Sequence, residues 1–266
     1  IEMIGLDTNA ISALFMTHYH SDHIGDMGEL MLKHWATAGA TEPLPIYGPP
    51  GLEEVLAGFE AAYRLDQTYR VAHHGTEVMP PSGFGGEAHL FDLGIDLTAS
   101  AVVYQSGDVE VIAFNVDHKP VFPAVGYRVN YKDRSVVITG DTIYTDSLVQ
   151  HAMGADVLVS EALNHKFADM LADAGQDSDT NVSAVAEDIQ TYHITPEEVG
   201  IVARDAEIST LLITHILPPV RSKLLVNPFL RELRRVYDGS ITMANDGTMA
   251  KLPVGSEKVI IKELLK

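Results

Sequence analysis

The chain has 266 residues, 46% of them hydrophobic, and is therefore long enough to bury a substantial core. Its 37 acidic residues outnumber 18 basic ones, and the formal charge of −19 opposes non-specific contact with phosphate backbones or anionic membranes. Cysteine is absent, which excludes disulfides and thiolate ligands. Neither a transmembrane-length apolar run nor a signal-peptide pattern is present, so we expect a soluble protein, cytoplasmic, periplasmic or secreted.

Strands and helices alternate along the chain, which predicts a layered α/β fold. The predicted helices are 24–35, a helix that opens at 49–51 and ends near residue 63, 195–206 and 228–237. The predicted strands are 109–116, 124–131, 135–139, 155–159 and 210–214. Nothing marks a linker, so we expect one domain over 1–266, with the turn-rich segment at about 66–100 as an insertion that forms a lid or a dimer arm.

The most informative motif combines three imidazoles and a carboxylate just after an apolar stretch at 11–16. These residues are His18, His20, Asp22 and His23. In an extended segment His18 and His20 project to the same side, while a turn after Ser21 brings Asp22 and His23 round from another direction. The motif therefore predicts that one loop supplies ligands to two neighbouring metal ions, and a histidine-rich surface loop is the weaker interpretation.

Further motifs follow in chain order, several of them at the end of an apolar strand. They are 115–118 (NVDH), 126–128 (GYR), 135–142 (SVVITGDT), 159–162 (VSEA), 192–195 (YHIT) and 211–216 (LLITHI). Together with the first motif, this set resembles the metallo-β-lactamase superfamily of binuclear metallohydrolases, in its ribonuclease Z and arylsulfatase branch. The resemblance extends from residue 11 to about residue 246, and the order of the motifs argues against chance.

The resemblance implies an αββα sandwich and a binuclear metal centre. The family normally places two or three strands before the first motif, whereas sixteen residues precede Thr17 here, so we expect the first strands to be missing from this chain. The implied metal ligands are His18, His20, Asp22, His23, His118, Asp141 and His215, with Asp141 bridging the two ions. Five imidazoles and two carboxylates suit two zinc ions, and manganese or iron would also accept these ligand types.

The resemblance also implies a catalytic apparatus that uses a metal-bound hydroxide as the nucleophile. Asp22 is the expected orienting group or general base, and His193, supported by Glu161, is expected to stabilise or protonate the leaving oxygen. His73, His74 and Phe84 are candidate substrate-binding residues of the insertion, with an ordinary surface loop as the equal alternative.

Several activities occur on this fold, so the substrate has to be argued separately. We expect a hydrolase of small anionic esters, an arylsulfatase or phosphodiesterase-like enzyme. The alternatives are a ribonuclease Z-type endonuclease that processes the 3′ end of transfer RNA, and a lactonase or β-lactamase-like hydrolase. The acidic 69–100 segment disfavours nucleic acid as a partner, because RNA binding needs basic groups. No membrane partner is expected, and a homodimer is the default for relatives.

Overall fold

A computed structural model describes residues 2–5, 7–176 and 180–265 of the chain. The chain divides at Asp92 into two units, and the second extends from Leu93 to Leu264. Each unit has its own sheet and its own hydrophobic core. Within the described ranges, no helix is both long and apolar enough to cross a membrane.

The first unit is built on a small parallel sheet with the strand order β1-β2-β3. Its strands are β1 (Leu14–Phe15), β2 (Leu44–Gly48) and β3 (Gly86–Leu90), and its helices are α1 (Ser21–Ile24), α2 (Met27–Ala36) and α3 (Leu52–His74). Short 3-10 helices lie at Glu2–Ile4, Thr8–Ala10 and Pro81–Gly83. The core is formed by buried methionine and aliphatic side chains, namely Met16, Met27, Met31, Leu44, Ile46, Leu52 and Leu56.

Two helices of this unit differ in extent from their sequence-based predictions. The predicted helix 24–35 is interrupted after Ile24, so α1 and α2 are separate. Helix α3 continues eleven residues beyond the predicted end at residue 63, because residues 64–74 contain neither Gly nor Pro and Arg70 pairs with Asp66 one turn earlier at 2.6 Å. The helix ends at Gly75, whose φ of +81° suits glycine.

The segment predicted as an insertion at about 66–100 therefore contains regular structure. It comprises the end of α3, the 3-10 turn Pro81–Gly83, β3 and the start of β4 (Ser100–Ser106). Strand β3 pairs in parallel with β2 along its whole length. Whether any part of this segment acts as a lid stays a prediction.

The second unit is built on a seven-stranded mixed sheet with the order β10-β9-β8-β7-β6-β5-β4. Strands β4 to β7 form an antiparallel meander, and β7 to β10 are parallel. The strands after β4 are β5 (Val109–Asn115), β6 (Val125–Tyr131), β7 (Arg134–Ile138), β8 (Val157–Leu163), β9 (Thr210–Leu217) and β10 (Ser240–Met243). A separate hairpin pairs β11 (Thr248–Lys251) with β12 (Ile260–Glu263). The five strands predicted in this region are confirmed, and their ends differ from the prediction by at most four residues.

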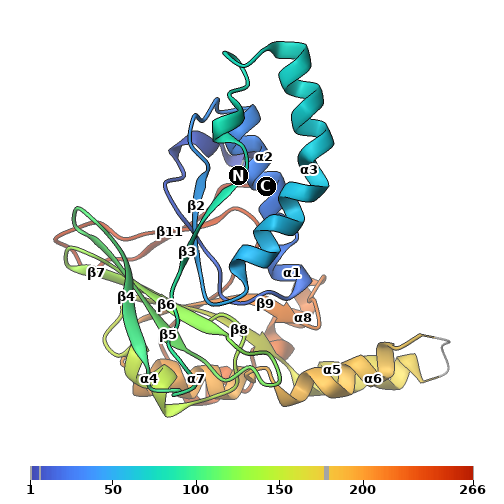
Figure 1. The fold of residues 1–266 in the computed structure, drawn as a ribbon. Helices are drawn as coiled ribbons and strands as arrows, with labels where there is room; N and C mark the ends of the chain where they lie inside the picture. Colours follow the sequence, from blue (N-terminus) through green and yellow to red (C-terminus); the bar gives the residue numbers. More distant parts are fainter. Residues whose placement is uncertain (1, 6, 177–179, 266) are drawn as a thin grey trace. The chain divides into compact units, whose positions relative to one another are not determined.

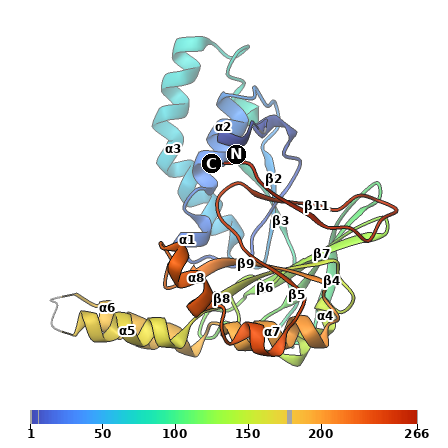
Figure 2. The same cartoon turned by 180° about the vertical axis from the view of Figure 1, so that it is seen from behind.

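Helices of the second unit cover the sheet and extend from it. They are α4 (Asp146–Ala152), α5 (His165–Gly175), α6 (Val182–Asp188), the 3-10 turn Ile189–Thr191, α7 (Pro196–Asp205), α8 (Lys223–Phe229) and α9 (Leu233–Val236). Helices α4 and α7 lie along one face of the sheet (Figure 1), and α5 and α6 project from it as a pair (Figure 2). Helix α7 begins with the capping box that its sequence predicts, between Thr195 and Glu198. The predicted helix 228–237 is instead divided between α8 and α9.

Candidate metal centre

The histidine motif of the first unit lies between the end of β1 and helix α1. His18 Nε2 lies 3.1 Å from His20 Nδ1, so the two ring nitrogens converge on one point as the alternation of an extended segment predicts. Helix α1 then turns the chain and brings the His23 ring within 4.1 Å of the His18 ring, measured between centroids. Asp22 lies next to His23, with its carboxylate oxygen 3.4 Å from His23 Nε2. The local fold therefore gathers all four motif residues.

Tyr19 fixes this loop to the turn that precedes α3. Its hydroxyl donates a hydrogen bond to the Pro49 carbonyl oxygen at 2.5 Å, and burial raises the pKa of the phenol above its usual value. Gly51, at a φ of +106°, lets the turn approach the Tyr19 ring, because a Cβ there would lie only 3.1 Å from the ring. The side chain between the two converging histidines thus acts as an anchor that holds their backbone.

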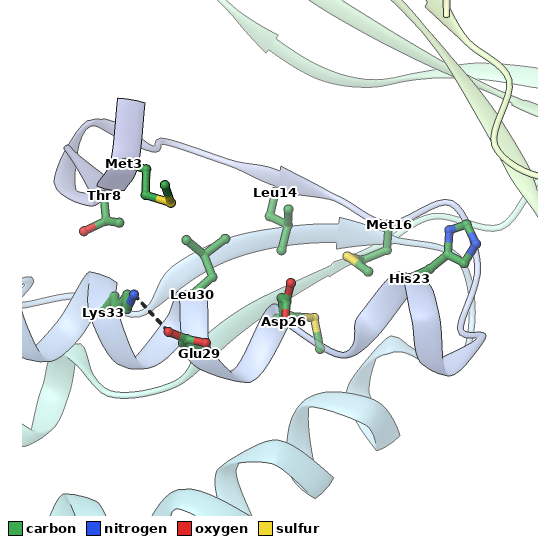
Figure 3. A pocket seen from close by; sticks show the side chains of 10 residues that line it. Met3, Thr8, Leu14, Met16, His23, Asp26, Glu29, Leu30 and Lys33 are labelled. Carbon is green, nitrogen blue, oxygen red and sulfur yellow. Dashed lines mark ion pairs between the residues drawn. The ribbon is translucent and has the colours of Figure 1, made fainter. Parts of the chain in front are cut away.

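A pocket of about 510 Å³ lies beside this loop within the first unit, between β1 and α2 (Figure 3). Its lining is mainly apolar, with Leu14, Met16 and Leu30 among the side chains that the figure labels, and His23 stands at one end. Glu29 and Lys33 pair with each other at 2.9 Å on its α2 side. The environment of His23 is therefore partly apolar, which influences the electrostatics of any metal held there.

In the second unit, Asp141 lies between two of the predicted histidine ligands. Its Oδ2 is 3.8 Å from His118 Nε2, and its Oδ1 is 3.5 Å from His215 Nδ1. Each carboxylate oxygen therefore faces a different imidazole. This is the arrangement that a carboxylate needs in order to bridge two metal ions, each with its own histidine ligand.

His215 owes its position to an irregularity in the sheet. The pairing of β8 with β9 shifts between Ser160, opposite Ile213, and Ala162, opposite Ile216, so β9 carries one extra residue at this point. His215 lies in the extra length with a φ of +41°, in the left-handed region that non-glycine residues rarely adopt. The bulge lies opposite Glu161 of the neighbouring strand β8. His215 and Glu161 are therefore at the same height along the two strands.

A backbone contact determines which nitrogen of His118 can bind metal. His118 Nδ1 lies 2.9 Å from the Tyr192 carbonyl oxygen, which can only accept a hydrogen bond. Nδ1 therefore carries the proton, and the lone pair of the neutral ring is on Nε2, the atom that faces Asp141. The Tyr192 ring also packs against the His118 ring, with centroids 5.3 Å apart.

Glu161 and His193 form a buried pair. His193 Nδ1 lies 2.7 Å from Glu161 Oε2 and 2.9 Å from Oε1, and the Thr142 amide donates to Oε1 at 2.8 Å. Burial, and secondarily the negative charge of Asp141, hold the pKa of the Glu161 carboxyl well above its usual range. The pair orients the His193 ring so that Nδ1 faces Glu161 and Nε2 points away from it.

The donor atoms of the second unit are close enough to hold a metal ion. One ligand atom each from Asp141, Glu161, His193 and His215 lie within 4.8 Å of one another. Imidazole nitrogens and carboxylate oxygens are ligands that zinc and manganese both accept, so this donor set fits a transition metal. Asp141 and His215 are the members that the sequence predicted as ligands, whereas Glu161 is already engaged by Thr142 and His193.

The three predicted substrate-binding residues are in the first unit. His73 and His74 form the exposed end of α3, and their rings contact each other at 4.7 Å between centroids. Phe84 is partly buried and packs edge-on against the buried Trp35 ring, with the two ring centroids 5.2 Å apart. A role of these residues in substrate binding stays a prediction.

Two site residues were missed in the sequence. Tyr192 supplies the carbonyl that orients His118, and Thr142 supplies the amide that binds Glu161. Both act through the backbone, which leaves no signature in the residue type. Their only signal is adjacency, since Thr142 follows Asp141 and Tyr192 precedes His193.

A comparison with protein families explains why these residues occur together. Residues 3–216 match the model of the beta-lactamase superfamily domain. The chain belongs to the metallo-β-lactamase superfamily. The predicted family is therefore confirmed, and with it the α/β fold class, and the chain is a hydrolase of the metallo-β-lactamase fold.

Several curated relatives of the chain are ribonucleases. The chain is 36% identical over 217 residues to ribonuclease Z of Mycobacterium sp. (strain KMS), a match that covers 81% of this chain and 69% of the relative. It is 34% identical over 219 residues to ribonuclease Z of Mycobacterium bovis (strain BCG / Pasteur 1173P2), covering 82% and 71%. The expectation that disfavoured nucleic acid as a partner is therefore wrong. That expectation rested on the acidity of the 69–100 segment, and the charge of one segment does not describe the whole surface.

Solved structures of metallo-β-lactamase proteins share the fold. The protein YhfI from Bacillus subtilis superposes with a TM-score of 0.58 at 22% identity, covering 90% of this chain and 77% of that one. The short form of human tRNase Z superposes with a TM-score of 0.56 at 21% identity, covering 80% and 74%.

Proposed function

We propose that this metallo-β-lactamase-fold hydrolase is a metal-dependent ribonuclease of the ribonuclease Z type, which cleaves a phosphodiester bond near the 3′ end of precursor transfer RNA. The observation that carries the proposal is the 36% identity to ribonuclease Z over most of the chain. The buried pair Glu161–His193 beside Asp141 adds support, because it provides a positioned acid next to a metal-binding carboxylate. The reported relatives give no specific support to a sulfate ester as the substrate.

The proposed metal ligands are the seven residues that the family motifs identify. They are His18, His20, Asp22, His23, His118, Asp141 and His215. The proposal that all seven serve one centre rests on the order and identity of these motifs. When bound, two metal ions lower the pKa of a coordinated water and stabilise negative charge that develops on a phosphoryl oxygen.

The protein's own groups handle the protons of the reaction in this proposal. The Glu161 carboxylate accepts the hydrogen bond from His193 Nδ1 and stabilises the imidazolium, whose Nε2–H can pass its proton to the leaving oxygen and leave the neutral ring. Asp22 is proposed to orient the attacking water. His118 keeps its ligand tautomer because the Tyr192 carbonyl holds its other nitrogen protonated.

A panel of substrates tests this function. The purified protein, with its metal content measured, is assayed on a precursor transfer RNA, bis-nitrophenyl phosphate, a nitrophenyl sulfate and a lactone. We expect the RNA to give the highest kcat/KM, chelation to abolish cleavage, and added zinc or manganese to restore it. A higher kcat/KM for the sulfate or the lactone, with no cleavage of the RNA, would show that the proposed substrate is wrong.

A further inference from the structure

Basic side chains are concentrated in one short part of this acidic chain. Five of the 18 basic residues lie within 221–235, and Glu232 is the only acidic residue there. These five residues, here called the basic segment, are Arg221, Lys223, Arg231, Arg234 and Arg235. A protein with a net charge of −19 that acts on RNA needs such a local concentration, because phosphates are repelled by most of its surface.

Helices α8 and α9, with the residues just before and between them, present the basic segment to solvent. Phe229, Leu230 and Leu233 are buried in the core of the second unit and anchor the two helices, whereas all five basic side chains are exposed. The burial of one side and the exposure of the other fix the cations on the outer surface. The segment is therefore a supported part of the fold and not a loose tail.

The positive charges of the basic segment are little used within the protein. Over the part of the chain that the structure describes, Arg221, Lys223, Arg231 and Arg235 form no ion pair within 4.0 Å, and Arg235 and Arg231 act on Glu232 only at longer range, after Lys166. Glu232, the acidic residue among them, pairs with Lys166 of α5, and Arg234 donates to the neutral side chain of Asn227 at 2.5 Å. A ligand with several negative charges would find these cations available.

Hydrogen bonds tie the basic segment to the strands that carry the candidate site. Asn164 follows directly after β8, which contains Glu161, and its amide donates to the Leu217 carbonyl at the end of β9 at 2.9 Å. The side-chain amide of Asn164 donates to the Phe229 carbonyl at the end of α8 at 3.0 Å. Arg221 is only six residues beyond His215. The basic segment thus begins at the same ends of β8 and β9 as the residues of the site.

We propose that the basic segment binds backbone phosphates of the RNA substrate next to the cleaved bond. This inference rests on the proposed function. Four of its five cations are arginines, whose guanidinium groups match phosphate oxygens in a bidentate way. The basic segment would let the acidic enzyme bind RNA. It is a different part of the sequence from the acidic 69–100 segment, which led us to disfavour a nucleic-acid partner.

The test is RNA binding by the full-length, metal-loaded protein. The probe is a labelled precursor transfer RNA with an uncleavable phosphonate at the scissile position, titrated at several salt concentrations. The variant combines Arg221→Gln, Lys223→Gln, Arg231→Gln and Arg235→Gln. We expect its affinity to fall about tenfold or more near 0.1 M salt, and the slope of log K against log salt to decrease by about 2 to 3, since each lost phosphate contact contributes about 0.7.

A second variant removes the same charge elsewhere in the second unit. It combines Lys132→Gln, Lys251→Gln, Lys258→Gln and Lys262→Gln, four exposed positions outside the basic segment. We expect its salt slope to match that of the wild type. Circular dichroism checks the fold of both variants. An Arg→Lys version of the first variant, which keeps the charge, should recover most of the slope.

The outcomes separate this inference from the proposed function. If the wild type cleaves RNA and the first variant binds it with unchanged affinity and slope, the basic segment is not the RNA surface, while the proposed function stands. If the wild type neither binds nor cleaves RNA, both fall. If the variant instead loses binding to vesicles that contain phosphatidylserine and keeps its RNA affinity, the segment is a membrane-binding surface and the inference is wrong.

Discussion

Replacing Glu161 by Gln isolates the role of the buried pair, because the two side chains have nearly the same shape. The amide oxygen can keep the hydrogen bond from the Thr142 amide, which is 2.8 Å long in the wild type. That oxygen also lies 2.9 Å from His193 Nδ1 and can keep accepting from it, whereas the amide nitrogen replaces the acceptor at 2.7 Å. The neutral amide removes the negative charge beside the His193 ring, so the imidazolium that would deliver a proton from Nε2 loses its main stabilising partner.

The effect on stability should be small because two contributions oppose each other. The raised pKa of Glu161 means that the folded protein disfavours the ionised carboxylate, with burial as the main cause. A neutral side chain removes this penalty, which amounts to several kcal/mol for a buried ion. The loss of a hydrogen bond to a charged group costs about 1.5–3 kcal/mol. We expect the free energy of unfolding of the metal-free protein to change by less than about 2 kcal/mol.

The effect on catalysis should depend on the leaving group. General acid catalysis contributes about 10²–10⁴ in rate, so kcat on the precursor transfer RNA should fall by about 10² or more. Bis-nitrophenyl phosphate releases nitrophenolate, which needs little protonation, and its kcat should fall less than tenfold by the same argument. KM and metal content should stay near the wild-type values. His193→Ala should give the same selective loss, and the double variant should lose little more.

Three results would refute this reasoning. Equal losses on both substrates would mean that the pair does not assist the leaving group. Unchanged rates would remove both residues from the reaction. Loss of bound metal in Glu161→Gln, measured by elemental analysis, would mean that Glu161 is a ligand, as its distance to His215 and Asp141 would allow.

Two predictions concern the stability of the second unit. Burial, and then the charge of Arg128, lower the pKa of His151 below its usual 6.5, so the unfolded state takes up its proton first. The contribution of this residue to stability is therefore full above pH 6.5 and is lost as the pH falls below it. The midpoint of thermal unfolding should drop more steeply from pH 7 to pH 5 in the wild type than in His151→Gln. Parallel curves for the two proteins would contradict this prediction. Gly126→Ala should destabilise by about 1–3 kcal/mol in chemical denaturation, because the new Cβ would lie 2.5 Å from the Phe114 ring and 2.9 Å from the Ile138 carbonyl oxygen. Gly58→Ala, on the open face of α3 where nothing lies within 4 Å, is the matched control and should be neutral or stabilising.

The sequence predicted those elements whose local pattern is strong. Strands β5 to β9 follow from apolar runs bounded by turns, and α7 follows from its capping box. The extent of α3 was underestimated because its hydrophobic pattern is weak beyond residue 63, and its continuation depends on the absence of a breaker before Gly75. The break between α1 and α2 falls at Gly25, a weak helix former, whereas residues 230–232 between α8 and α9 contain neither Gly nor Pro.

The residues of the site were named from motifs, but their arrangement was not predictable from them. The convergence of His18 and His20 follows from the alternation of an extended chain. The hydrogen bond from His118 to Tyr192 joins residues 74 positions apart, and the contact between Glu161 and His193 joins residues 32 apart. The prediction that disfavoured nucleic acid was wrong because the charge of the 69–100 segment stood in for the whole surface, whereas exposed cations occur elsewhere, the basic segment among them.

Because β9 carries one extra residue, an insertion or deletion of a single residue can change the position of His215 during evolution. The ladder is regular on both sides of the irregularity, from Val157 opposite Thr210 and again at Leu163 opposite Leu217. An insertion or deletion that restored perfect pairing would leave these flanks intact yet rotate His215 to the opposite face, because successive strand residues point in opposite directions. A single-codon event could thus silence the enzyme while sparing its architecture, and the reverse event could create a metal-ligating position in an inert sheet.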